Sequence, residues 1–183
     1  MFIGRSRFLV IACSLFVCAG FAAAEEEVKT KSVTFFNDSA SLDVPTSFES
    51  APPKSRMLQY EFKVGEEDKA ARLTMMAAGG GVDPNIKRWK GQFSGGDPKE
   101  QKSEKIQVDG WDVHIVDCSG SFSERMGGPF AGGKVVQREN WAMLGGIIAQ
   151  PEGRLFFVKL TGPAETVKAN RKAFVAMLKS LKH

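Results

Sequence analysis

The chain has 183 residues, of which 43% are hydrophobic, so it is long enough to form one domain with a sizeable core. Its 25 Lys and Arg residues only slightly outnumber its 21 Asp and Glu residues, and its formal net charge is +4 at pH 7. Because this excess is small and the sequence contains no nucleic-acid-binding motif, we expect no nucleic-acid partner.

Residues 1–24 predict a secretory signal peptide. Arg5 and Arg7 precede a short apolar run over residues 8–19, and Ala22-Ala23-Ala24 supplies a small-residue cleavage site before an acidic stretch. We therefore expect cleavage near Ala24 and a mature protein that is periplasmic or secreted. No later stretch approaches the roughly 20 apolar residues of a transmembrane helix. Residues 25–183 are expected to form a single α+β domain.

The three cysteines predict neither a lipid anchor nor a disulfide. Cys13 and Cys18 lie within the signal segment, where lipidation is an alternative; the residue before Cys18 is too large and the apolar run before Cys13 too short for that pattern. Cleavage would leave Cys118 as the single thiol, so no intramolecular disulfide is expected. Free cysteine is usually buried, and we predict this for Cys118, leaving its reactivity open.

The first part of the chain predicts β-strands joined by turns. Residues 32–36 and 40–44 form one predicted hairpin, and residues 57–64 and 71–77 form a second. Residues 48–55 contain Pro52-Pro53 and are expected to form a loop. Hydrophobic and charged residues alternate over 60–64, which indicates that one face of this strand is exposed to solvent.

The middle of the chain predicts a short helix and another hairpin. Asp83 fits an N-cap that is followed by proline at the first helical position, and the apolar side of the helix would comprise Ile86, Trp89 and Phe93. Residues 94–105 are polar and predict a surface loop. Asp109-Gly110 is a strong turn signal between strands at 105–108 and 111–118, the second of which has a pattern that can continue to Phe122.

The C-terminal part predicts a β-hairpin followed by an amphipathic helix. Strands at 141–149 and 154–161 flank the turn at 150–153, and Pro163 suits the first helical position. One apolar stripe recurs at helical spacing and consists of Val167, Phe174, Met177, Leu178 and Leu181. We expect this helix to lie across the sheet.

These elements predict an α+β fold in which an antiparallel β-sheet of about six to eight strands is covered by a C-terminal helix and a short middle helix. The segment Leu42-Asp-Val-Pro45, the run 156–163 and the helix pattern from Arg171 to Leu181 resemble small exported bacterial proteins of unknown function. Their architecture is similar to the PsbP-like group, the extrinsic photosystem subunits of the thylakoid lumen. This resemblance implies an antiparallel sheet between helices and an accessory, partner-binding role. It carries over no catalytic residue.

Three motifs that could carry chemistry are disfavoured by their context. Gly128 to Lys134 matches part of a phosphate-binding loop, but Val135 follows in place of Ser or Thr and the next segment predicts a strand. His114 and Cys118 would lie about 13 Å apart on one strand, too far for a nucleophile and its base. The acidic turn 66–68 is typical of a solvated hairpin. We predict neither a metal site nor a cofactor.

Two functions remain open. The first is an exported noncatalytic module that binds a protein or small ligand at the cell envelope, for which Arg138, Trp141 and Lys159 form a candidate binding surface near the Gly-rich segment 126–134. The alternative is a hydrolase whose carboxylates come together only in the fold. Trp111 and Trp141 each begin an apolar strand, so core packing is the expected default for both.

Overall fold

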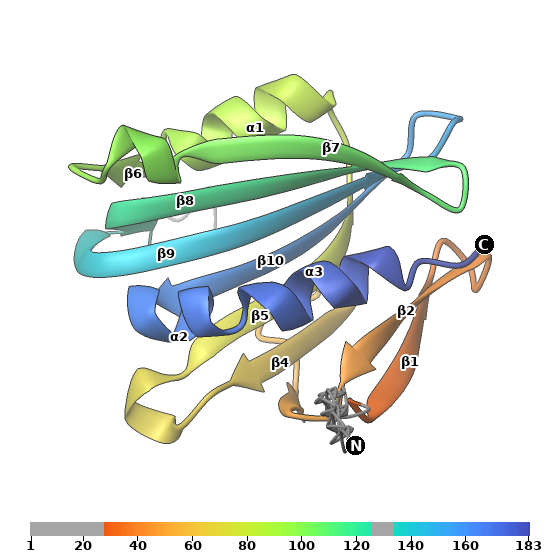
Figure 1. Cartoon of the computed structure of the whole chain (residues 1–183), viewed down its shortest axis with the longest axis horizontal. Coiled ribbons are helices and arrows are strands. Elements are labelled where there is room, and N and C mark those ends of the chain that lie inside the picture. Colours follow the sequence, from red (N-terminus) through yellow and green to blue (C-terminus); the bar gives the residue numbers. More distant parts are fainter. Residues whose placement is uncertain (1–27, 126–133) are drawn as a thin grey trace, which may run out of the picture.

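A computed structural model describes residues 28–125 and 134–183 of the chain. It contains an eight-stranded antiparallel sheet, a separate two-stranded sheet, and helices on both faces of the larger sheet (Figure 1). The predicted signal peptide and residues 126–133 of the Gly-rich segment lie outside the described residues. No helix among the described residues is long and apolar enough to cross a membrane.

The larger sheet has the strand order β3-β4-β5-β10-β9-β8-β6, and β7 also pairs with β8. Its two longest strands, β8 and β9, are neighbours and carry 15 residues each. The strands of this sheet are β3 (Phe48–Ala51), β4 (Tyr60–Val64), β5 (Ala71–Ala78), β6 (Phe93–Ser94), β7 (Lys102–Val108), β8 (Trp111–Arg125), β9 (Val135–Ala149) and β10 (Leu155–Pro163). The smaller sheet comprises β1 (Thr30–Phe35) and β2 (Ala40–Pro45).

The helices cover opposite faces of the large sheet. Helix α1 (Val82–Lys90) packs on one face, and α2 (Ala164–Ala169) and α3 (Arg171–Lys179) pack on the other together with the β1-β2 hairpin (Figure 1). Two adjacent glycines of β9 permit this close packing. A Cβ atom on Gly145 would lie 2.4 Å from the Trp89 ring, and one on Gly146 would lie 2.7 Å from the Leu178 side chain. Only glycine allows both helices to approach the sheet this closely.

The predicted fold class is confirmed, including the sheet and the two covering helical regions. All five residues of the predicted C-terminal stripe are buried. The helix is divided at Asn170 into α2 and α3, and α2 begins at Ala164 because Pro163 is still the last residue of β10. The prediction that Pro163 starts the helix was therefore wrong by one residue.

Several predicted boundaries were wrong. Residues 48–51 form β3 and not a loop, because their backbone pairs with β4. Helix α1 begins at Val82 with Gly81 as its N-cap; Asp83 is inside the helix, and Phe93 belongs to β6. The predicted loop 94–105 contains the start of β7 at Lys102 and a short 3₁₀ turn, Pro98–Glu100.

The β1-β2 hairpin is held in place by residues that follow α3. Ser41 and Lys182 exchange two backbone hydrogen bonds of 2.8 and 3.1 Å, and the Asp43 amide donates to Ser180 Oγ over 2.8 Å. Phe35 of β1 stacks on Phe156 of β10 with ring centroids 4.1 Å apart. The hairpin therefore closes the core over the α2-α3 face of the sheet.

Candidate binding site

Helix α1 covers only part of its face of the sheet and leaves an open cleft beside it. Two adjoining cavities of about 190 and 330 Å³ share Thr74, Gln92 and Lys159 as lining residues. We call their union the α1-face cleft. Its remaining lining residues are Ala70, Arg72, Met76, Arg88, Trp89, Phe122, Glu124, Trp141, Phe157 and Thr161.

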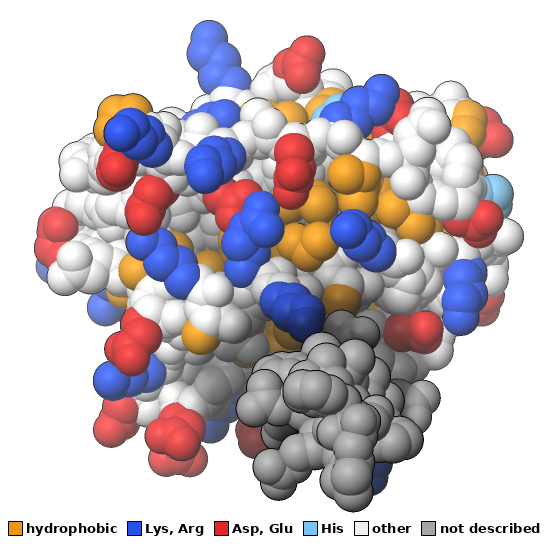
Figure 2. Space-filling model, in the orientation of Figure 1, with side chains coloured by type: hydrophobic (Ala, Val, Ile, Leu, Met, Phe, Trp, Pro, Cys, Tyr) orange, Lys and Arg blue, Asp and Glu red, His pale blue; other side chains and the backbone are white. Residues whose placement is uncertain are grey.

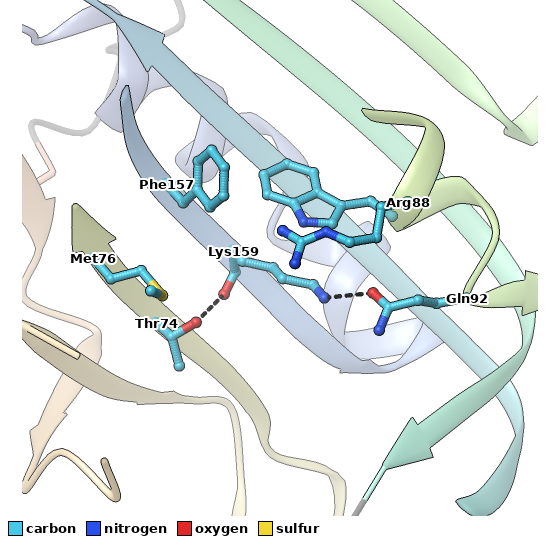
Figure 3. A pocket seen from close by; sticks show the side chains of 7 residues that line it. Thr74, Met76, Arg88, Gln92, Phe157 and Lys159 are labelled. Atoms are coloured by element: carbon cyan, nitrogen blue, oxygen red, sulfur yellow. Dashed lines mark hydrogen bonds between the residues drawn. The ribbon is translucent and has the colours of Figure 1, made fainter. Parts of the chain in front are cut away.

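Lys159 lies where the two cavities meet. Strand alternation places it on the same face as Phe157, opposite Thr74 of β5. Its Nζ atom donates a hydrogen bond to Gln92 Oε1 over 3.0 Å (Figure 3). The same atom lies 5.9 Å from the centroid of Trp89 and 5.6 Å from that of Phe122, within the range of cation–π contacts.

Burial lowers the pKa of Lys159 to about 8, and the nearby charge of Arg88 contributes in the same direction. No carboxylate among residues 28–125 and 134–183 forms an ion pair with Lys159. The ammonium group is therefore a largely desolvated cation held by one amide oxygen and two aromatic faces.

The outer wall of the cleft is aromatic and charged. Trp141 stacks almost parallel on Phe122, with ring centroids 5.7 Å apart and an interplanar angle of 3°. The Arg138 guanidinium lies 5.6 Å from the Trp141 ring centroid and forms a 3.0 Å ion pair with Glu124. The pairing of β8 with β9 shifts between Gly120 and Phe122, where β9 carries one residue more than β8.

The three residues of the predicted binding surface thus lie together. Trp141 and Lys159 line the same cavity, and Arg138 covers the Trp141 ring from outside that lining. Trp111 is buried in the core as expected. Trp141 is only half-buried, so core packing describes Trp111 better than Trp141.

An ion pair between Arg72, which lines the larger cavity, and the buried Glu61 lies beside the cleft. Glu61 of β4 is only 4% exposed and accepts two hydrogen bonds from Arg72, of 2.7 and 2.8 Å, and one from the Lys54 amide. The hydrogen bond from Arg72 is the main cause that lowers the pKa of Glu61. The alternation over 60–64 predicted that Glu61 lies on a solvent-exposed strand face. In the structure Arg72 covers Glu61, so this part of the face is buried.

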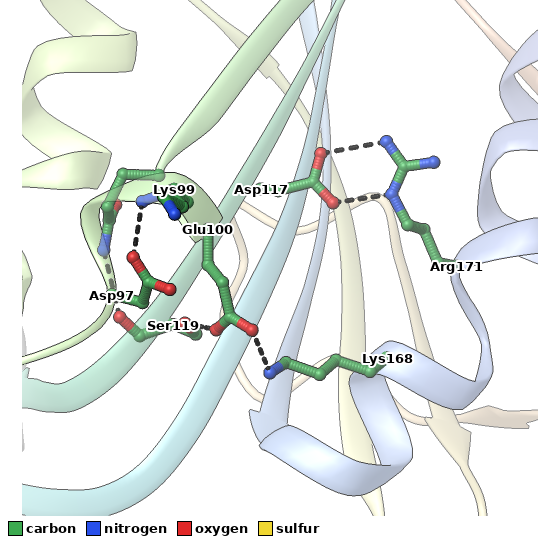
Figure 4. A network of polar contacts seen from close by, with 8 residues as sticks. Asp97, Lys99, Glu100, Asp117, Ser119, Lys168 and Arg171 are labelled. Atoms are coloured by element: carbon green, nitrogen blue, oxygen red, sulfur yellow. Dashed lines mark hydrogen bonds and ion pairs between the residues drawn. The ribbon is translucent and has the colours of Figure 1, made fainter.

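Another cavity, of about 460 Å³ and larger than either part of the α1-face cleft, lies on the opposite face, beside α2. Arg171 forms a bidentate pair with Asp117, with bonds of 2.7 and 3.1 Å, and also reaches Glu104. Lys168 pairs with Glu100 over 2.7 Å, and Glu100 accepts a hydrogen bond from Ser119 (Figure 4). Charges of both signs alternate over this side of the molecule (Figure 2). Here Lys168 and Arg171 have acidic partners, so the network holds the helices to β7, β8 and the 3₁₀ turn before β7.

The candidate nucleophile is inaccessible. Cys118 is 2% exposed, which confirms that it is buried, and burial raises the pKa of its thiol to about 11. His114, four residues earlier on β8, is half-buried, and burial lowers its pKa. Among the described residues no group of three His, Cys, Asp or Glu side chains could hold a metal ion.

Sequence reasoning missed most of the cleft. Gln92 follows α1, Glu124 lies on β8 beyond Phe122, where the predicted strand could end, and nothing distinguished Arg72 from the other charged residues of the sequence. Lys159 carried the one local signal, because a lysine in the middle of the apolar run 155–160 must be accommodated by specific neighbours.

No family model matches the chain, and no curated protein sequence matches it. Its fold is similar to solved structures. The solution structure of cyanobacterial PsbP (CyanoP) from Synechocystis matches 90% of this chain and 98% of its own, with a TM-score of 0.51 and 11% identity. The Saccharomyces cerevisiae Ran-binding protein Mog1p matches 85% and 95%, with a TM-score of 0.54 and 8% identity. LpqN of Mycobacterium tuberculosis matches 85% and 91%, with a TM-score of 0.50 and 13% identity. The chain therefore has a PsbP-like fold.

Proposed function

We propose that the chain is an exported noncatalytic module that binds a protein or small ligand at the cell envelope, and that it binds through the α1-face cleft. One observation carries this proposal: Lys159 is half-buried at the junction of two open cavities, with aromatic rings beside it and no carboxylate partner in the described part of the chain. A concave site with an apolar lining and a few convergent polar groups is typical of ligand recognition.

The names of the structural neighbours agree with a binding role. Mog1p is named a Ran-binding protein, and LpqN is described as involved in cell envelope biogenesis. Other proteins with a similar fold are thus named for protein binding and for a role in the cell envelope. For this chain, export rests on the predicted signal peptide, residues 1–24.

The carboxylates beside the cleft favour binding over hydrolysis. A hydrolase of the carboxylate type would need two carboxylates close together, with one kept protonated by its surroundings. Glu61 and Glu124 are instead each paired with an arginine, and the pKa of Glu61 is lowered. Both side chains therefore position cations, which suits a binding wall better than acid–base catalysis.

The proposal is tested by native mass spectrometry of the tagged full chain, recovered gently from the envelope of the source cells. We expect the wild type to retain a discrete bound mass, either a protein or a small molecule. Arg138→Ala, Trp141→Ala and Lys159→Ala should weaken this retention, and Lys179→Ala, an exposed α3 lysine away from the cleft, serves as the control. Circular dichroism checks that each variant is folded. Retention that is normal in all three cleft variants would reject this placement.

A further inference from the structure

We infer that the α1-face cleft takes a small organic carboxylate with an apolar or aromatic body. The carboxylate would lie against Lys159 and Gln92, and the body would lie against Trp89 and Phe157. This inference rests on the proposed binding function and adds the chemical class of the ligand.

The charges of the cleft are unequally matched. Arg72 is paired with Glu61 over 2.7 Å, and Arg138 with Glu124 over 3.0 Å. Arg88, the other cation of the smaller cavity, donates a 2.8 Å hydrogen bond to the neutral Asn85 amide. Lys159 forms its one side-chain hydrogen bond with a neutral amide, Gln92, so two of its three N–H donors have no partner among the described residues. A carboxylate in the cleft would supply the counter-charge that the surrounding residues do not.

Gln92 favours a carboxylate over other anions. Its Oε1 accepts the hydrogen bond from Lys159, so its Nε2 donors point away from the ammonium and make no hydrogen bond within the described residues. An ammonium and an amide side by side can serve the two oxygens of one carboxylate. A phosphate group is usually bound by several cations or by the amides of a helix N-terminus. The smaller cavity has two cations, Lys159 and Arg88, and Gln92 lies just after the C-terminal end of α1, not at a helix N-terminus.

The smaller cavity is suited to the apolar part of such a ligand. Its lining includes Met76, Trp89 and Phe157, and the two aromatic rings meet edge to face with centroids 4.9 Å apart. Figure 3 shows Phe157, Arg88 and Gln92 facing the same space as Lys159. A volume of about 190 Å³ is enough for a single ring or a short aliphatic chain.

The arrangement also predicts how binding depends on pH. The charged and titratable groups around Lys159 are Arg88 of α1, Arg72 of β5, and Cys118 and Glu124 of β8. The pKa of Lys159 is about 8, and a bound carboxylate would raise it. Affinity should therefore be greatest below pH 8 and fall as the pH rises through 8, with proton uptake on binding in that range. The Cys118 thiol, with a pKa of about 11, titrates outside this window.

The test uses two matched pairs of probes with the full chain: phenylacetate with phenylacetamide, and hexanoate with hexanamide. Isothermal titration calorimetry gives the affinities at pH 7 and pH 9, and fluorescence of Trp89 and Trp141 reports on the cleft. We expect each acid to bind roughly tenfold more tightly than its amide at pH 7. Lys159→Met keeps the apolar stem and should abolish this preference, whereas Lys179→Met should preserve it.

Equal affinity of acid and amide would overturn the inference. So would a preference that survives in a folded Lys159→Met variant, the absence of binding by both acids up to about 10 mM, or tighter binding of phenyl phosphate than of phenylacetate. A neutral molecule that is retained by the wild type in native mass spectrometry and lost in Trp141→Ala would reject the carboxylate and leave the binding function standing. Retention that is unchanged in all three cleft variants would reject both.

Discussion

Removing Arg72 should destabilise the fold more than altering Glu61, its partner. The Glu61 side chain is 3% exposed and cannot reach water, whereas Arg72 is 45% exposed and can turn towards solvent. Breaking a buried ion pair costs about 3–5 kcal/mol when the remaining charge is left unpaired in the interior. In Arg72→Met, Glu61 keeps only the hydrogen bond from the Lys54 amide. We therefore place the loss at the lower end, about 3 kcal/mol.

The conservative change Glu61→Gln should cost only about 1 kcal/mol, because the amide oxygen can still accept a hydrogen bond and Arg72 can be hydrated. For a chain of this size, 3 kcal/mol lowers the melting temperature by roughly 6–12 °C. Urea unfolding at pH 7, followed by tryptophan fluorescence, measures both free energies of unfolding.

The Arg72–Glu61 pair also determines how the stability of the fold changes with pH. The pKa of Glu61 in the folded wild type is lowered below its ordinary value, so the pair contributes stability above that ordinary value and loses it as the pH falls through the folded pKa. In Arg72→Met we expect the pKa of the unpaired, buried Glu61 carboxylate to rise, so that it is protonated at a higher pH than in the wild type. The difference between wild type and variant should therefore be largest at pH 7 and shrink towards pH 4.5. A pH-independent difference, or a greater loss in Glu61→Gln, would refute this account.

Three further predictions concern other parts of the chain. Gly145→Ala should lower the free energy of unfolding by about 1–3 kcal/mol, because the new methyl group overlaps the Trp89 ring; Gly79→Ala, where a Cβ meets no atom within 4 Å, is the control in the same urea titration. Cys118 should react slowly with iodoacetamide at pH 8 in the folded protein and rapidly in urea, since its thiol is buried with a pKa of about 11; peptide mass spectrometry measures the labelling, and equal rates would contradict it. N-terminal sequencing of the exported protein should begin at Glu25, and an uncleaved chain would exclude the predicted signal peptide.

Much of the fold could be predicted because hydrophobic periodicity reports directly on burial. The apolar stripe of the C-terminal helix and the Asp109-Gly110 turn could both be predicted from the local sequence. Both residues of that turn have positive φ, as the predicted turn type requires. The boundaries were less predictable. Phe48–Ala51 has a polar pair in its middle and two prolines after it, so only the pairing with β4 makes it a strand.

The cleft was harder to predict because its residues are distant in the sequence. Lys159 and Gln92 are 67 positions apart and meet only because β10 lies in the middle of the sheet and α1 packs across it. The sequence places Lys159 within the apolar run 155–160. It could not indicate that Gln92 would be its hydrogen-bond partner, since that contact depends on sheet order.

The bond between the Asp43 amide and Ser180 Oγ has a consequence for the timing of folding. The first hairpin of the described chain has its anchor 137 residues later, so β1 and β2 cannot reach their final position while the intervening chain is still being synthesised. Contacts of such long sequence separation form slowly and late. If the chain is exported through a membrane translocon by its predicted signal peptide, the β1-β2 hairpin cannot dock before Ser180 is available. The chain would therefore stay competent for translocation until then.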